Sequence, residues 1–131
     1  MKRKRIYMYQ QAIDSNYSAH KGYISIPLNV TNIKSVCCVL HNAEGYISIV
    51  KEINEEQIIN EMRLSDDEMH INSKKVDVDV VPDNADLKFV LKLTKIYHGD
   101  ITGQKQQDSK TTNIYSTDCT LKIIIEYEEN V

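Results

Sequence analysis

The sequence predicts a single-domain, mostly β protein: an antiparallel β-sandwich or barrel-like fold of about seven strands with one short helix. Three segments carry this prediction, because apolar and polar residues alternate along each of them with the period of two that is typical of a half-buried strand. They are KKVDVDVVP (74–82), DLKFVLKLTKIY (86–97) and CTLKIIIEYEE (119–129). The length of 131 residues fits one domain, 1–131, with a sizeable core.

The pentapeptide GYISI occurs twice, beginning at Gly22 and at Gly45. An internal repeat is not predicted. When the sequence is aligned with itself so that the two copies coincide, the polar strand and loop residues after the first copy align with an acidic, helix-like stretch after the second. Each copy instead predicts a strand that follows a glycine turn. In the first copy Ile24 and Leu28 face the same side, and Pro27 indicates an edge strand because proline cannot donate to a sheet ladder.

Two further strands are expected to form a hairpin. Val36–Leu40 is an apolar run, and the polar connection 41–45 joins it to the alternating segment Tyr46–Val50. The N-terminal segment RIYMYQQAI (5–13) predicts one more strand.

The pattern changes in NEEQIINEMRL, where we expect the short helix at about 54–64. Ile58 and Met62 are one helical turn apart, and Asn54 followed by Gln57 resembles a capping box. The neighbouring acidic residues suit the positive end of a helix.

Charge and cysteine content limit the classes of partner and the compartment that we expect. The formal net charge is -3, from 16 basic and 19 acidic residues, and this balance argues against nucleic acid or an anionic membrane as the main partner. The three cysteines include the adjacent pair Cys37 and Cys38, which indicates a reducing compartment, and hence the cytoplasm, at synthesis. No apolar run approaches the ~20 residues of a membrane helix.

Residues that could carry catalysis or hold a metal are present, but their spacing does not match a known site. The histidines are His20, His41, His70 and His98, without metal-ligand spacing. The acidic series that a calcium ion could use is Asp77, Asp79, Asp83 and Asp86, of which the first two form the water-facing side of a strand. We therefore expect no enzymatic activity, no catalytic residues, no metal site and no cofactor.

Segments outside the predicted core are candidates for contacts with other protein chains. They are a basic tail at 1–5, the strand at 22–30 and a long polar loop at 98–113. Tyrosine is enriched at protein contacts, and the chain has eight tyrosines against one phenylalanine and no tryptophan. The candidate partner-binding residues are Lys2, Arg3, Lys4, Arg5, Tyr23, Tyr46, Gln104 and Lys105.

The stretch GYISIPLNVTNIKSVCCVLHNAEGYISI (22–49) resembles small all-β structural proteins of tailed-phage virions, of the capsid accessory or connector-ring type. The resemblance implies a repeated, oligomeric subunit that becomes part of a virion. One alternative is a regulatory or nucleic-acid-associated module that uses the basic N-terminus. The other is a carbohydrate-binding β-sandwich, for which tyrosines and acidic loops would serve.

Overall fold

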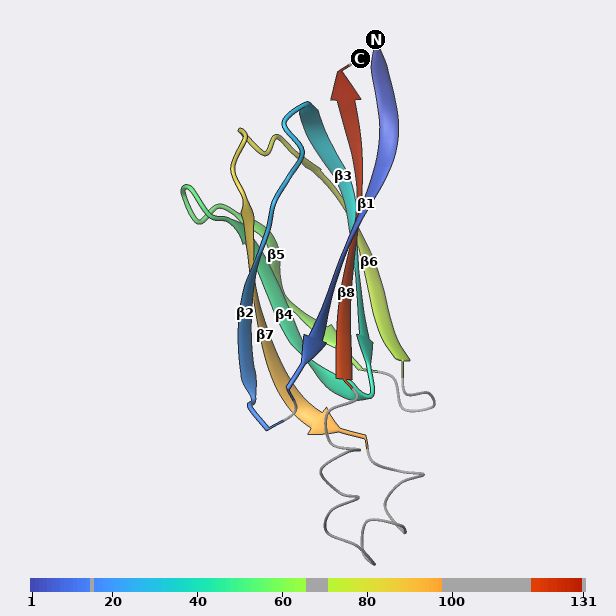
Figure 1. Ribbon diagram of the computed structural model, residues 1–131, viewed down its shortest axis with the longest axis vertical. Helices are drawn as coiled ribbons and strands as arrows, with labels where there is room; N and C mark the ends of the chain where they lie inside the picture. The colour runs from blue at the N-terminus through green and yellow to red at the C-terminus, as the bar shows by residue number, and fades with distance from the viewer. Residues whose placement is uncertain (15, 66–70, 98–118, 131) are drawn as a thin grey trace, which may run out of the picture.

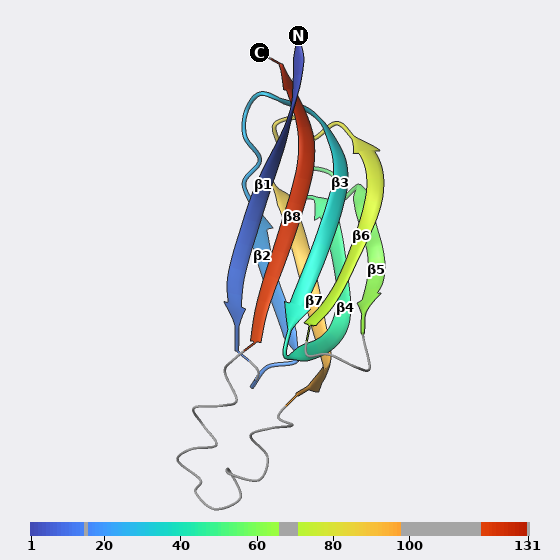
Figure 2. The ribbon, with the colours of Figure 1, turned by 90° about the vertical axis from the view of Figure 1, so that its right-hand side faces the viewer.

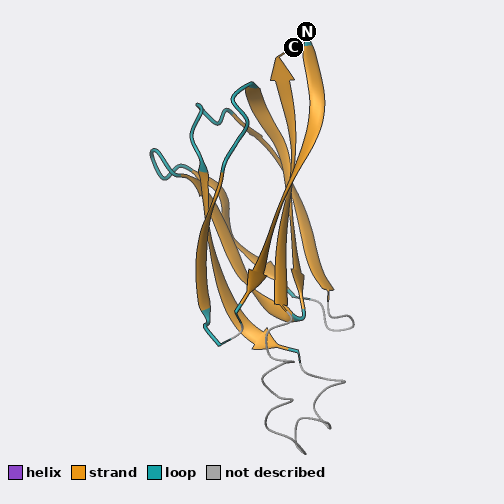
Figure 3. Ribbon diagram, in the orientation of Figure 1, coloured by secondary structure: helices purple, strands orange, loops and turns teal. Residues whose placement is uncertain are grey.

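Two four-stranded antiparallel sheets face each other in the computed structural model, which describes residues 1–14, 16–65, 71–97 and 119–130 (Figures 1 and 3). The strands are β1 (Lys2–Ile13), β2 (Ala19–Ile24), β3 (Val30–His41), β4 (Ala43–Lys51), β5 (Gln57–Leu64), β6 (Ile71–Val80), β7 (Leu87–Ile96) and β8 (Cys119–Asn130). One sheet has the order β1-β8-β3-β6 and is called the β1 sheet; the other has the order β2-β7-β4-β5 and is called the β2 sheet. The described residues contain no helix, and so none that could cross a membrane.

The strand pairing defines the fold. Strands β1 and β8, β2 and β7, β3 and β6, and β4 and β5 form nested antiparallel pairs, so the chain resembles one long hairpin rolled up into two sheets. Further pairing of β3 with β8 and of β4 with β7 joins these pairs within each sheet. This arrangement is an eight-stranded jelly roll. The predicted mostly β, antiparallel sandwich is confirmed.

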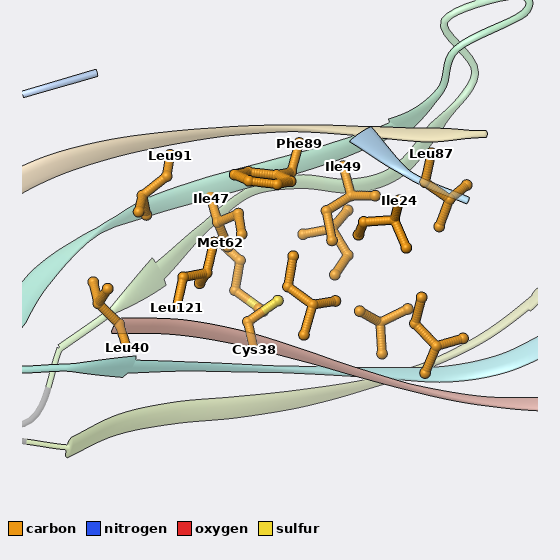
Figure 4. Close-up of a cluster of buried hydrophobic side chains, with 14 of the residues drawn as sticks. Ile24, Cys38, Leu40, Ile47, Ile49, Met62, Leu87, Phe89, Leu91 and Leu121 are labelled. Atoms are coloured by element: carbon orange, nitrogen blue, oxygen red, sulfur yellow. The ribbon is translucent and has the colours of Figure 1, made fainter. Parts of the chain in front are cut away.

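The core lies between the sheets and consists of the side chains that alternate inward along each strand. Figure 4 shows Phe89, Ile47 and Ile49 of the β2 sheet facing Cys38 and Leu121 of the β1 sheet. All five side chains are fully buried. Three segments predicted from strict alternation form β6, β7 and β8, and the segment 5–13 lies within β1.

The predicted helix at 54–64 is wrong: the chain turns and then forms β5. Ile49 pairs with Ile59 and Ile47 with Met62, so β5 uses one more residue than β4 and forms a bulge near Glu61, whose φ is 41°. The bulge lets Ile59 and Met62 both point into the core although they are three residues apart. Ile59 and Met62 therefore have the three-residue spacing of apolar residues on one face of a helix, although they lie in a strand.

The start of the expected helix is a turn. The Asn54 side chain accepts a hydrogen bond from the Glu56 backbone N–H at 3.0 Å, two residues on, as in an Asx turn. Glu55 has a φ of 57°, outside the helical region. The polar residues at this point close the connection between β4 and β5.

The expected hairpin of 36–40 with 46–50 is also wrong. These residues belong to β3 and β4, which lie in different sheets. The chain passes from one sheet to the other at Asn42, whose φ of 63° is a left-handed conformation that asparagine tolerates. The corner is one residue long, and Glu44 and Gly45 already belong to β4.

Both glycines of the repeated pentapeptide lie inside strands, and neither has a positive φ. Each is required by a close approach: a Cβ on Gly22 would meet the Phe89 ring, and a Cβ on Gly45 would meet the carbonyl oxygen of Lys92. Pro27 correctly indicated an edge, since β2 is an edge strand. The strand ends before it, however, and Leu28 is 80% exposed instead of facing the core.

We expect Gly22→Ala to lower the free energy of unfolding by about 1–3 kcal/mol, because the added methyl group overpacks the core against Phe89. Urea unfolding measures the loss. The same substitution in a Phe89→Leu background should cost less, since the ring that it meets is gone. An equal cost in both backgrounds would show that the close approach is unimportant.

Candidate interaction surface on the edge strand

Strand β1 is an edge strand of twelve residues, paired with β8 along its whole length. Its other side faces no strand of the described residues. In Figure 1 the first part of β1 and the last part of β8 extend beyond the β2 sheet, with the two chain termini side by side. Figure 2 shows the β1 sheet face-on, with β1 at its border.

Large apolar side chains are exposed on this strand. Tyr7 and Tyr9 are partly buried against the core, so the residues that alternate with them point outward. Ile6 is 68% exposed and Met8 is 55% exposed. Met8 pairs with Ile124 of β8, which extends the apolar surface into the sheet. We call Ile6, Met8 and Ile124, together with the unpaired edge of β1, the β1 surface.

A groove of about 470 Å3 adjoins the β1 surface. Its lining residues are Lys4, Arg5, Ile6, Lys34, Glu126 and Tyr127. Glu126 forms an ion pair with Lys75 at 2.8 Å, and this lysine holds the pKa of the carboxyl below its ordinary value. The groove combines cations with an apolar wall, so it can hold a side chain of a neighbouring molecule.

The basic residues expected as a tail belong to β1 from Lys2 onward. The Arg3 guanidinium donates to Oε1 of Glu129 at 2.8 and 3.1 Å, and Arg5 Nε donates to the same oxygen at 2.9 Å. These two arginines, Arg3 first, hold the pKa of Glu129 below its ordinary value. These contacts attach the basic first residues of β1 to Glu129 near the C-terminal end of β8.

The other predicted partner-binding residues do not join the β1 surface. Tyr23 lies on β2 and Tyr46 on β4, on the outer face of the β2 sheet. Gln104 and Lys105, with the whole segment 98–113, fall outside the described residues. Sequence reasoning missed Ile6 and Met8. Alternation in IYMY places Ile6 and Met8 on one face of the strand and Tyr7 and Tyr9 on the other. Which of these two faces packs against the core depends on the opposite sheet.

The thiols and the acidic residues are spread over several elements in the part of the chain that the structure describes. Burial, and secondarily Cys37, raises the pKa of Cys38 to about 12, so this thiol stays protonated at neutral pH. Asp77 and Asp79 lie on exposed positions of β6, whereas Asp83 binds Lys51 in a loop. No three His, Cys, Asp or Glu side chains among the described residues are grouped to hold a metal ion.

No family model and no curated protein sequence matches the chain. Among solved structures, the Drosophila NLP core, described for pentamer formation and histone binding, is 10% identical with a TM-score of 0.39 over 98% of both chains. Latent PorU from Porphyromonas gingivalis is 6% identical with a TM-score of 0.49; the match covers 97% of this chain but 13% of PorU.

A virus-like particle of the Macrobrachium rosenbergii extra small virus contains a further similar chain. It is 5% identical with a TM-score of 0.34, over 99% of this chain and 80% of the viral one. These TM-scores lie below 0.5, and the assignment of the jelly roll rests on the strand order.

We expect Glu129→Gln to loosen the first residues of β1, because Arg3 and Arg5 lose their charged acceptor. Backbone amide exchange over residues 2–6 should become faster. Glu128→Gln is the matched control: it removes the same charge one residue away, on the opposite side of the strand. Equal protection in both variants would contradict the role of Glu129.

Acid should have the same effect on the parent protein. Because the folded-state pKa of Glu129 is lowered, its contribution is fully present above the ordinary glutamate pKa and is lost as the pH falls through the lowered value. Protection factors over residues 2–6, which correct for the intrinsic pH dependence of amide exchange, should therefore fall below about pH 4, and the Glu129→Gln variant should lack this dependence.

Proposed function

We propose that this protein is a non-enzymatic structural subunit that binds other protein chains, including further copies of itself, through the β1 surface. One observation carries the proposal: on β1, exposed apolar side chains coincide with a strand edge that pairs with no other described strand. Exposed edges are normally blunted by charges, proline or a covering segment. Strand β1 has lysine and arginine only at positions 2–5, and no charged residue occurs from Ile6 to Ile13.

The half of β1 that lacks charges is well suited to pairing with another chain. Added strands gain backbone hydrogen bonds from the edge and specificity from alternate side chains. Ile6 and Met8 would supply the apolar contact, and the groove beside Ile6 would accept a side chain of the partner. The basic residues before Ile6 would limit how far a pairing strand can extend.

The particular assembly that we propose is a virion, with this chain as a capsid or connector component made in a reducing compartment. Support comes from the resemblance of residues 22–49 to structural proteins of tailed-phage virions. Jelly rolls are also common in viral capsids, which is an analogy at the level of the fold. Cys37 and Cys38 form no disulfide bond with a described residue, as suits a reducing compartment.

The double substitution Ile6→Ser and Met8→Ser tests the β1 surface. Both side chains are exposed, so the thermal unfolding temperature should stay within a few degrees of the parent's. Self-association should weaken at least about tenfold, which corresponds to ~1.4 kcal/mol. Sedimentation velocity over a concentration series measures it.

Ile71→Ser is the control, since Ile71 is also exposed but lies on β6, at the opposite edge of the same sheet. It should leave association unchanged. A parent protein that stays monomeric and captures no partner from its native source would overturn the proposed function. Unchanged association of the Ile6 and Met8 variant would show that another surface is used.

A further inference from the structure

The outer face of the β2 sheet is basic. Its cations are Lys21 on β2, Lys88 and Lys92 on β7, and Arg63 on β5. None of the four forms an ion pair with another described residue. We call these four cations, with Tyr23 and Tyr46, the basic face.

The tyrosines stand among these cations. Tyr23 is directly opposite Lys88, and Tyr46 is opposite both Lys92 and Arg63. Exposed Glu61 lies at the β5 border, where its backbone N–H donates to Ser48 Oγ at 3.1 Å. The basic face therefore combines four cations that form no ion pair with a described residue and two aromatic rings.

One end of the molecule is acidic. The β4–β5 connection, residues 52–56, and the β6–β7 connection, residues 81–86, lie together there, and Glu52 N–H donates to the Asp86 carbonyl at 2.9 Å. The two connections carry five carboxylates. Together with the ammonium group of the neighbouring Lys51 they have a formal charge of about -4. We call the two connections the acidic end; they contain Glu52, Glu55, Glu56, Asp83 and Asp86.

The acidic end is joined by the contacts of one buried lysine and presents apolar side chains. Buried Lys51 binds Glu56 at 2.8 Å, Asp83 at 2.7 Å and the Val81 carbonyl at 3.0 Å, which holds the two connections together. Ile53 is 68% exposed and Val81 is 52% exposed. Figure 1 shows the β4–β5 connection projecting beside the β2 sheet.

We propose that the acidic end of one copy docks on the basic face of a second copy. The two surfaces have opposite charge and belong to one chain, and each also carries apolar or aromatic side chains that gain from burial. Two identical faces would repel each other, so the contact is heterologous and leads to a ring or an open chain of subunits. The inference rests on the proposed function but uses a surface other than the β1 surface.

A second copy fits the basic face better than a nucleic acid does. The overall charge of -3 repels a polyanion at long range, whereas the acidic end brings its negative charge to one place. Ile53 and Val81 have no use in binding phosphates, but they can pack against Tyr23 and Tyr46. The observations thus favour a protein partner with acidic and apolar groups, which this chain supplies.

Charge reversal on each surface tests the inference. The face variant is Lys88→Glu with Lys92→Glu, and the end variant is Glu52→Lys with Glu55→Lys. The side chains of Glu52 and Glu55 are exposed and form no ion pair among the described residues, so the Lys51 contacts are kept. In sedimentation velocity at low salt, each variant alone should lose at least about tenfold in self-association.

Recombining the altered surfaces shows whether the basic face and the acidic end bind each other. An equimolar mixture of the face and end variants should form a one-to-one heterodimer, because each supplies the surface that the other lacks. The fourfold variant should stay dissociated, since neither of its two surfaces keeps a net charge. Lys122→Glu, a charge reversal on β8 of the other sheet, is the control and should change nothing.

The failures of the two proposals are separable. If the parent associates and the charge variants associate equally, the docking contact is overturned while the proposed function stands. Absence of the heterodimer also overturns it. If the face variant instead loses binding of a labelled oligothymidine without a change in self-association, the basic face binds nucleic acid. A parent that stays monomeric overturns the docking contact, and it overturns the proposed function as well if it captures no partner from its native source.

Discussion

The contact between the two sheets at Phe89 is the constraint on which the rest of the structure depends. Its fully buried ring covers Gly22 of its neighbour β2 and meets Tyr9 of the opposite sheet edge-to-face, with ring centroids 5.7 Å apart. Full burial of such a ring stabilises the fold by about 1.5–3 kcal/mol. The same contact orients β1, because Tyr9 can reach Phe89 only if Met8 points outward. Core packing and the exposed apolar surface are thus two consequences of one strand orientation.

Buried charged groups determine the geometry at the two ends of the sandwich. Lys51 at one end satisfies its ammonium group with two carboxylates and a carbonyl, and Asp83 and then Glu56 raise its pKa. At the other end Glu44 accepts hydrogen bonds from the hydroxyls of Tyr97 and Ser65, which lower its pKa. Removing one partner from such a group leaves a poorly solvated charge, which is costly. Each connection is therefore held at one position relative to its neighbours, a condition for any surface that must match another.

The two outer faces of the sandwich differ in how their charges are balanced. On the β1 sheet, cations pair with anions across strands, as Lys75 does with Glu126 and Lys34 with Asp79. The cations of the basic face have no such partners in the described part of the chain. A molecule with an apolar edge, one face with paired charges and one face with unpaired cations has distinct directions for the neighbours that we propose. That asymmetry suits an assembly that uses more than one kind of contact.

Strict alternation in the sequence determined β6, β7 and β8, because a residue period of two specifies a strand wherever one face is buried. Proline and charge patterns likewise indicated the edge position of β2 and the water-facing side of β6. The tertiary structure alone decided three things: that β3 and β4 enter different sheets, that 54–64 forms a bulged strand, and that Tyr9 rather than Met8 faces the core. Sheet membership, bulges and the choice between two apolar faces depend on which strand lies opposite. Such contacts join residues far apart in the chain, and no local pattern encodes them.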